Sequence, residues 1–450
     1  MTIQEFGEKL RAQAITSAQI VDACLERIEA ANRATNAFIL VMADEACRQA
    51  READRELAAG HDRGPLHGVP LSIKDLIDVQ GTATTAASRV RDGHIAAHDA
   101  PTIAHLRTAG AVFVGKTNLH EYALGTTSGD SAFGPVRNPL DTTRSPGGSS
   151  GGSAASVAAG MALGTVGTDT GGSIRIPASC CGIVGLKPSF GEVSTDGVIP
   201  LSTSLDHVGP LALTVADAWT LFRVLMGDLA PQGLAPAAPS ALRLAVPRPY
   251  FCDMLDDDVR RRFEEALDRF RAAGMSVREI EIPHTETIAT VYMHIALREA
   301  AVYHAPMLAV VPERYTPPVR QRLEMGQHIQ MEDYVRALAG RDELRRDVKA
   351  ALVDFDALAL PTLPIPAPAI GAELVQVGTA KEPLRSIMLR LTQLFNITGH
   401  PAISIPCGLT HEGMPCGLQL VGARGQTEAL VRTALACEAK MGQSGNRIIG

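Results

Sequence analysis

The sequence lacks several features that would place the protein in a specialised class. No stretch reaches the ~18 consecutive apolar residues that a membrane span requires, and the first residues, MTIQEFGEKLRAQAITSAQ, lack the apolar core of a signal peptide. The 8 cysteines form no CxxC pair and no Cys/His spacing typical of zinc. We therefore expect a cytoplasmic protein with reduced cysteines in its core, no metal, no other cofactor and no membrane association.

An excess of basic charge is also absent, since the formal net charge is −7. The densest basic cluster, Arg260 to Arg262, stands among acidic residues in a helical stretch, as is typical of a solvated helix face. We therefore expect no nucleic-acid partner and a small-molecule substrate instead. The chain has 450 residues, 46% of them hydrophobic and 20% charged, which is enough apolar material for a large globular core.

Hydrophobic periodicity predicts helices and strands along the whole chain. The predicted helices cover approximately 17–33, 43–59, 100–109, 215–226, 256–273, 284–311, 331–352 and 427–440. The predicted strands are a run ending at Lys74 and the segments 111–116, 242–247, 357–361, 403–408 and 416–422. The Ala- and Gly-rich segment 154–167 is expected to be a buried helix and strand.

Residues 126–209 are unusually rich in Gly, Ser and Thr, which is typical of a functional surface held on a rigid scaffold. Shortly before it, Gly110 to Thr117 (GAVFVGKT) matches the phosphate-binding pattern GxxxxGK[ST]. A phosphate cradle needs a loop between its glycines, whereas AVFV is a strand-like run. We therefore do not expect a nucleotide site there.

The run Gly147 to Gly151 (GGSSG) matches the GxSxG nucleophile elbow of α/β-hydrolases, with Ser149 as nucleophile. That interpretation requires a strand before the serine, and an acid and a histidine after it, for which Asp356 and His400 are candidates. The preceding residues, DTTRSP, are not strand-like. An α/β-hydrolase-type esterase with Ser149 as nucleophile is therefore kept only as an alternative.

A third interpretation combines three separated motifs. They are HGVPLSIKD, which carries Lys74, GGSSGGSA, which carries Ser149, and DTGGSIRIP, in which Ser173 follows 24 residues after Ser149. In order and spacing they resemble the signature of the amidase signature family, and GKTNLHEYALG, SAFGPVRNP, CGIVGLKPSFG and GHPAISIPCG match further family segments. The resemblance spans roughly residues 15–440. Three agreeing motifs are far more specific than either single match.

The residue types suit amide cleavage, which needs an activated serine, an oxyanion site and a proton for the leaving amine. The apolar residues before Lys74 favour burial, which lowers a lysine pKa and favours the neutral amine. We therefore predict Ser173 as nucleophile, Ser149 as proton bridge and Lys74 as general base. The predicted oxyanion donors are backbone N–H groups of the glycine-containing loop: Thr170, Gly171, Gly172 and Ser173 itself. The resemblance implies a cis peptide at Ser149 and supporting roles for Ser150, Asp169 and Arg175, the last two pairing with each other or with the backbone.

The resemblance also implies an α/β fold with a single large mixed β-sheet flanked on both faces by helices. We expect one domain over 1–450. Its predicted regions are a helical N-terminal region (1–62), a catalytic core with the signature loops (63–228), a more variable, pocket-forming region (240–355) and a return to the core sheet (356–441).

The family resemblance leaves the substrate open. Members cleave aryl, alkyl and fatty acid amides, carbamates, biuret and allophanate, and one is the A component of glutamyl-tRNA amidotransferase, which takes ammonia from glutamine. A glutamine site should hold a carboxylate for the substrate ammonium, but no Asp or Glu occurs between Pro383 and His411. We therefore expect a free-standing hydrolase of neutral, fairly apolar amides or carbamates, of the amidase or urethanase type, with a homodimer left open. A glutamine-dependent amidotransferase component that works in a complex is the alternative. The expected substrate-pocket residues are Leu124, Gly125, Thr126, Thr127 and Ile176.

Overall fold

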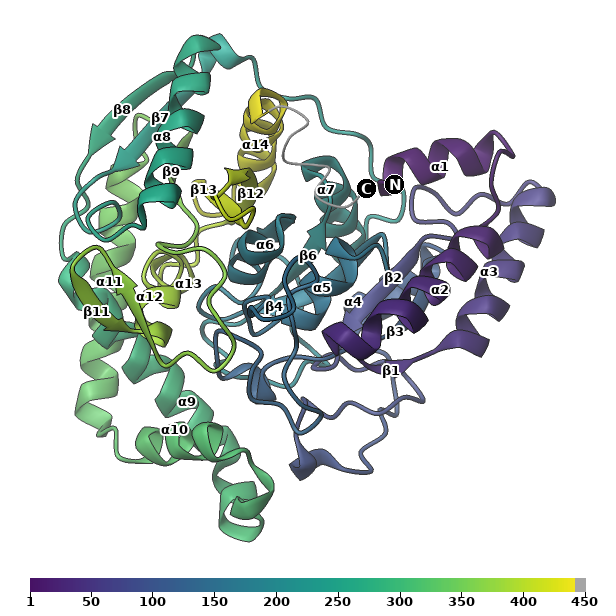
Figure 1. The fold of residues 1–450 in the computed structure, drawn as a ribbon, viewed down its shortest axis with the longest axis horizontal. Helices are drawn as coiled ribbons and strands as arrows, with labels where there is room; N and C mark the ends of the chain where they lie inside the picture. The colour runs from purple at the N-terminus through teal and green to yellow at the C-terminus, as the bar shows by residue number, and fades with distance from the viewer. Residues whose placement is uncertain (442–450) are drawn as a thin grey trace.

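One large β-sheet crosses the molecule in the computed structural model, which describes residues 1–441 (Figure 1). The sheet has 11 strands in the order β1-β3-β2-β4-β6-β5-β12-β13-β9-β7-β8, and β10 pairs with β11 separately. The strands are β1 (Phe38–Val41), β2 (Pro70–Lys74), β3 (Val112–Thr117), β4 (Gly164–Asp169), β5 (Val184–Lys187), β6 (His207–Ala212), β7 (Arg243–Pro247), β8 (Ser276–Ile280), β9 (Ala357–Pro361), β10 (Leu374–Val377), β11 (Ala380–Pro383), β12 (Ala402–Leu409) and β13 (Pro415–Val421). The α-helices are α1 (Ile3–Arg11), α2 (Ser17–Thr35), α3 (Ala43–Ala58), α4 (Pro101–Thr108), α5 (Gly151–Ala158), α6 (Arg175–Cys181), α7 (Val215–Leu225), α8 (Asp257–Ala272), α9 (Ile288–Val310), α10 (Pro317–Gln327), α11 (Met331–Ala351), α12 (Leu384–Leu389), α13 (Leu394–Ile397) and α14 (Thr427–Met441).

The sheet is mixed, and helices cover both of its faces. Strands run parallel in β3-β2-β4 and in β9-β7-β8 and antiparallel at the other pairings. Gly164 of β4 faces α7, because a Cβ added there would lie 2.8 Å from Leu221. The next residue, Thr165, shares a hydroxyl network with Ser156 of α5. Since successive strand residues point to opposite faces, α5 and α7 lie on opposite sides, and the predicted fold class is confirmed.

The glycine- and alanine-rich segment forms a buried helix followed by a buried strand, as predicted. Every residue of α5 is buried, and every residue of β4 is buried as well. A Cβ added at Gly152 would lie 2.3 Å from the carbonyl oxygen of Asn118. The small side chains therefore let α5 lie directly against the strands and loops that hold the site.

The remaining predicted helices and strands are confirmed, with ends that differ by a few residues. The helical pattern at 284–311 begins with a short 3₁₀ turn, and α9 itself starts at Ile288. Strand β8, SVREI, was not predicted because it lies at the sheet edge, none of its residues is buried, and the exposed Arg278 and Glu279 stand side by side in it. Helix α10 was also missed, since it starts with Pro317 directly after another helix–turn segment.

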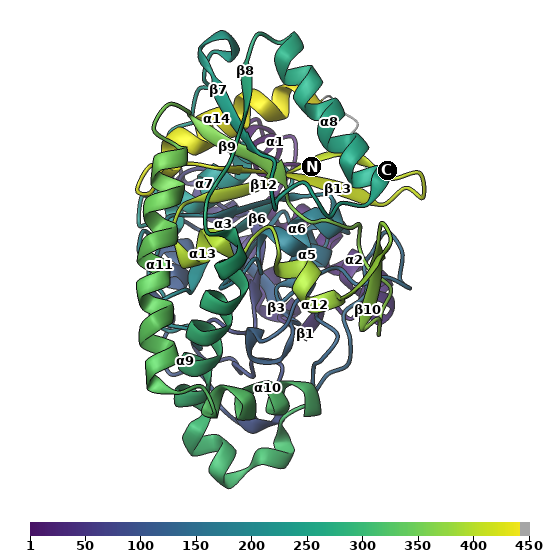
Figure 2. The ribbon, with the colours of Figure 1, turned by 90° about the vertical axis from the view of Figure 1, so that its left-hand side faces the viewer.

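Helices α9, α10 and α11 pack together at one end of the molecule (Figures 1 and 2). Within the described residues no helix has the length and apolar character needed to cross a membrane. All 8 cysteines are unpaired; Cys47 is half-buried on α3 and the others are buried in the core. The predicted division into regions along the chain stays a prediction.

Candidate active site

The three predicted motifs meet where neighbouring strands end. Lys74 is the last residue of β2, Ser149 lies just before α5, and Ser173 lies between the end of β4 and the start of α6. Strands β2 and β4 are parallel neighbours, so their carboxyl ends share one edge of the sheet. In open α/β sheets, ligands bind outside such carboxyl ends.

Lys74 is enclosed by hydroxyl groups. Its side chain has 0% exposure, and its Nζ lies 2.8 Å from Ser149 Oγ, 2.9 Å from Ser150 Oγ and 2.7 Å from Thr168 Oγ1. Burial lowers the pKa of Lys74 from 10.5 to about 7, against the opposing charges of Asp169 and Asp206. At neutral pH a large fraction of this amine is therefore unprotonated and able to accept a proton from a neighbouring hydroxyl.

The two serines differ in exposure. Ser149 is 0% exposed, whereas Ser173 is 6% exposed. The Ser150 N–H donates to the Ser173 carbonyl oxygen at 3.2 Å, which ties the two serine loops together. The peptide bond between Gly148 and Ser149 is cis. Of Lys74, Ser149 and Ser173, only Ser173 presents surface to a ligand.

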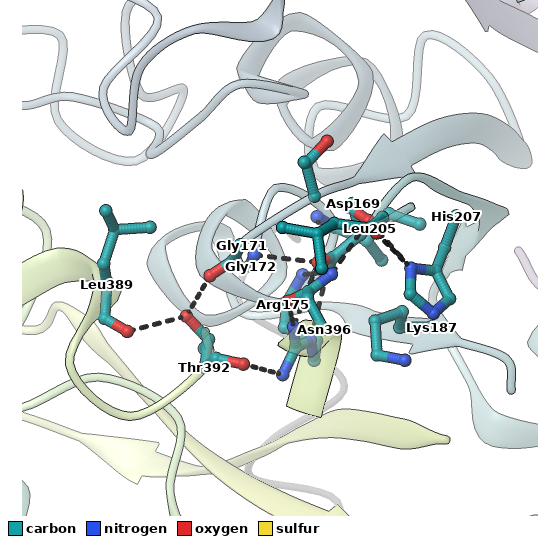
Figure 3. A network of polar contacts seen from close by, with 12 residues as sticks. Asp169, Gly171, Gly172, Arg175, Lys187, Leu205, His207, Leu389, Thr392 and Asn396 are labelled. Carbon is teal, nitrogen blue, oxygen red and sulfur yellow. Dashed lines mark hydrogen bonds and ion pairs between the residues drawn. The ribbon is translucent and has the colours of Figure 1, made fainter. Parts of the chain in front are cut away.

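Asp169 and Arg175 form a fully buried ion pair beneath the Ser173 loop (Figure 3). The Arg175 Nε and Nη2 atoms each lie 3.0 Å from Asp169, and the same carboxylate accepts from the backbone N–H groups of Gly172 and Ile174 at 2.8 and 3.1 Å. Although burial alone would raise the pKa of the Asp169 carboxyl, the Arg175 guanidinium holds it well below its usual range, aided by Lys187. The pairing implied for these two residues is confirmed, with each other and with the backbone.

The backbone N–H groups of the Ser173 loop divide into two sets. Among residues 1–441, the amides of Thr170, Gly171 and Ser173 have no hydrogen-bond acceptor, whereas the Gly172 amide donates to Asp169. The expectation that the Gly172 amide serves as an oxyanion donor is therefore corrected. Gly172 is needed for another reason: its φ is +139°, and a Cβ there would lie 2.3 Å from Thr392 Oγ1.

Two of the predicted pocket residues, Thr127 and Ile176, lie against the glycine-rich loops. A Cβ added at Gly148 would lie 2.9 Å from the Thr127 nitrogen, so the 124–127 loop borders the Ser149 loop. Ile176 packs between the loops, where its side-chain atoms would lie 2.7 Å from a Cβ at Gly172 and 3.1 Å from one at Gly147. Because Ile176 has 0% exposure, it supports the loops and offers no surface to a substrate in this structure.

Several residues at the site were not identified from the sequence. Thr392 Oγ1 donates to the Gly171 carbonyl oxygen at 2.6 Å, and Asn396 Nδ2 donates to Asp169 Oδ1 at 2.8 Å (Figure 3). Asp206 accepts from Thr170 Oγ1 at 2.6 Å, and burial raises the pKa of Asp206 to about 6. Thr168 is the third hydroxyl partner of Lys74. Each is polar, buried and remote in sequence from the motif it supports, so periodicity gave no signal for it.

The two rejected motifs behave as the sequence indicated. Val112–Thr117, the last six of the eight residues in the P-loop-like match, form strand β3, and the Lys116 ammonium is buried against Asp75 at 2.9 Å. No strand precedes Ser149, and His400 Nδ1 bonds to Thr398 Oγ1. Within residues 1–441, no group of three or more His, Cys, Asp or Glu side chains is arranged to hold a metal ion.

Known proteins resemble this chain along almost its whole length. The family model described as Amidase matches residues 19–431. An amidase of Pseudomonas putida is 39% identical over 453 residues, covering 97% of this chain and 95% of that protein. The A component of the glutamyl-tRNA(Gln) amidotransferase of Roseiflexus sp. (strain RS-1) is 39% identical over 468 residues, covering 96% of this chain and 94% of that protein. A crystal structure of an amidase superposes with a TM-score of 0.93 at 39% identity, covering 98% of this chain and 100% of the other. The chain belongs to the amidase signature family.

Proposed function

We propose that this protein hydrolyses the C–N bond of amides or carbamates through an acyl-enzyme on Ser173, with Lys74 as general base acting through Ser149. The observation that supports it most is the contact of 2.8 Å between Lys74 Nζ and Ser149 Oγ inside a fully buried pocket. Burial brings the pKa of this lysine to about 7, which is the range that suits a base at neutral pH.

The proton would move along a short path. Ser173 attacks the substrate carbonyl carbon while its hydroxyl proton passes to Ser149 Oγ, and the Ser149 proton passes to Lys74 Nζ. The C–N bond then breaks as the proton returns by the same path to the leaving nitrogen, which leaves an ester of Ser173. Water attacks that ester with the same base, and the acid product and free Ser173 hydroxyl are released.

The oxyanion of each tetrahedral intermediate needs backbone donors. The free N–H groups of Gly171 and Ser173, together with that of Thr170, are the proposed donors, since the Gly172 amide is occupied by Asp169. The Asp169–Arg175 pair and Thr392 fix the loop in place before substrate binds. Donors held in this way cost no reorganisation when the charge develops, and one of them is typically worth about 3 kcal/mol of barrier.

A glutamine-dependent amidotransferase component is the second candidate, because the relatives of similar identity include the A component of that enzyme. Against it, the segment 384–410 contains no Asp or Glu that could bind the ammonium of glutamine. Release of ammonia from glutamine by the isolated chain, or activity that depends on a co-purified partner, would favour this candidate. An esterase with Ser149 as nucleophile is disfavoured, because Ser149 is fully buried and no strand precedes it.

The test is a panel of p-nitroanilide, carbamate and glutamine substrates with the wild type, Ser173→Ala and Ser149→Ala, together with a serine-directed fluorophosphonate. We expect at least one non-glutamine substrate to be cleaved, turnover to fall by about 10³-fold or more in Ser173→Ala, and the label to attach to Ser173. Ser194→Ala, an exposed serine away from the site, is the matched control and should behave as wild type. Full turnover in Ser173→Ala, or labelling of Ser149 in place of Ser173, contradicts the proposal.

A further inference from the structure

Arg385, on the short helix α12, is a cation without a partner. Its Nε is buried and has no hydrogen-bond acceptor among residues 1–441. Within the same residues, no Asp or Glu oxygen lies within the 4.0 Å that defines an ion pair with its guanidinium. The residue as a whole is half-buried, and of its guanidinium nitrogens only Nε is a buried atom without an acceptor. A positive charge that no carboxylate neutralises is available to an anionic ligand.

The lack of a partner distinguishes Arg385 from the other arginines with an unsatisfied Nε. Arg223 and Arg341 also have a buried Nε without an acceptor. However, Arg223 pairs with Asp228 at 2.9 Å and Arg341 lies 3.9 Å from Asp342. Each of these two guanidinium groups therefore has a carboxylate within ion-pair distance, whereas Arg385 has none among residues 1–441.

Arg385 lies on a helix whose following turn contacts the Ser173 loop. A Cβ added at Gly171 would lie 2.3 Å from the Tyr292 hydroxyl and 3.0 Å from Leu389 Cδ2, so both side chains contact the Ser173 loop. Arg385 precedes Leu389 by four residues in α12 and therefore lies on the same face of the helix, one turn away. Burial lowers the pKa of Arg385, and Tyr292 is the neighbouring titratable group that opposes this shift.

A second guanidinium, that of Arg322, adds to the positive charge around Arg385. Arg322 of α10 donates to the Leu124 carbonyl oxygen at 3.0 Å, in the loop predicted to border the substrate, and lies 3.8 Å from Asp130. Burial lowers the pKa of Arg322 to about 10, and the charge of Arg385 lowers it further. Asp130 lies within ion-pair distance of Arg322 and of His120, and no Asp or Glu among residues 1–441 lies within that distance of Arg385.

We propose that the substrate carries a carboxylate, which Arg385 binds beside Gly171 and Tyr292. The substrate class is thus an amide or carbamate with a free carboxylate a few atoms from the scissile carbonyl, in place of the neutral, apolar substrate expected from the sequence. A planar guanidinium suits this role because it binds a carboxylate through two parallel hydrogen bonds. The proposal rests on Ser173 hydrolysis and adds the charge of the substrate to it.

Binding to an inactive variant tests the proposal without relying on turnover. Isothermal titration of Ser173→Ala with succinamate and with succinamide compares ligands that differ in one carboxylate. Glutaramate with glutaramide, and N-acetylglycine with its amide, extend the test to a longer spacing and to a carboxylate on the amine side. We expect at least one anion to bind ~30-fold or more tightly than its neutral partner, and the ratio to fall below ~3 when Arg385→Gln is added. Equal binding within every pair, or a ratio that Arg385→Gln leaves unchanged, overturns the proposal.

Control variants separate an effect of this site from a loss of folding or of overall charge. Arg336→Gln removes an arginine that is 77% exposed on α11 and should leave the ratio unchanged. Arg385→Lys keeps the charge but not the two parallel hydrogen bonds, so it should retain part of the preference for the anion. Failure of the hydrolytic proposal would appear separately, as full turnover in Ser173→Ala, because the binding ratios do not depend on turnover.

Discussion

The ionisation of Lys74 should control the acidic limb of the pH–rate profile. Burial lowers its pKa from 10.5 to about 7, a change that corresponds to about 5 kcal/mol disfavouring the ammonium. A lysine with an ordinary pKa would be about 0.03% neutral at pH 7, whereas this one is about half neutral. We expect kcat/KM to rise with pH up to a midpoint near 7 and to be ~100-fold below its plateau at pH 5.

Replacement of Asp206 by asparagine tests which group gives this limb. The Asp206 carboxylate raises the pKa of Lys74, so Asp206→Asn should lower that pKa and move the limb to lower pH. Asp206 itself has a pKa of about 6, raised by burial, and is the other group that titrates in this range. If Asp206 were the titrating group, the limb would disappear in Asp206→Asn instead of moving.

The assay is kcat/KM between pH 5 and 9 for the wild type and Asp206→Asn, on the best substrate of the panel. An uncharged substrate, if one is cleaved, should show the same limb, because its own protonation state does not change over this range. A flat profile, a limb that moves to higher pH in the variant, or one that does not move at all would refute the assignment of Lys74 as the base.

Three further substitutions test the packing of the site. Lys74→Met should abolish turnover but raise Tm at pH 7, with an increase of up to ~4 kcal/mol in the free energy of unfolding. The reason is that the unfolded chain binds a proton that the buried lysine largely gives up between pH 10.5 and 7. This gain in stability should shrink toward pH 10.5, and a lower Tm at pH 7 would contradict the idea. Gly172→Ala should lower both Tm and kcat, because φ is +139° and the new Cβ would lie 2.3 Å from Thr392 Oγ1; wild-type values of both would show that the loop has other conformations. Arg175→Met should cost about 3–5 kcal/mol in urea unfolding, because it leaves Asp169 buried without its counter-charge; a loss below ~1 kcal/mol would show that other groups neutralise the carboxylate.

The sequence was sufficient to predict most elements and the local setting of each catalytic motif. The apolar run before Lys74 predicted its burial, because side chains in a central strand are enclosed on both faces of the sheet. The strand-like interior of the P-loop match excluded a phosphate cradle for the same local reason. The order of the three motifs predicted the family and the fold class, and both are confirmed.

Contacts between distant segments were decided only by the tertiary structure. Thr392 and Asn396 reach the Ser173 loop from more than 200 residues away, because the sheet order places β12, which follows their segment, beside β5. The loss of the Gly172 amide to Asp169 also depends on the folded loop, since the sequence shows only that an N–H is present. Likewise, the sequence shows Arg385 as one arginine among many, and only folding reveals that, in the described part of the chain, no carboxylate lies within ion-pair distance of it. Local patterns specify elements because they depend on neighbouring residues, whereas the charge and the free hydrogen bonds of a pocket depend on which distant side chains the fold brings to it.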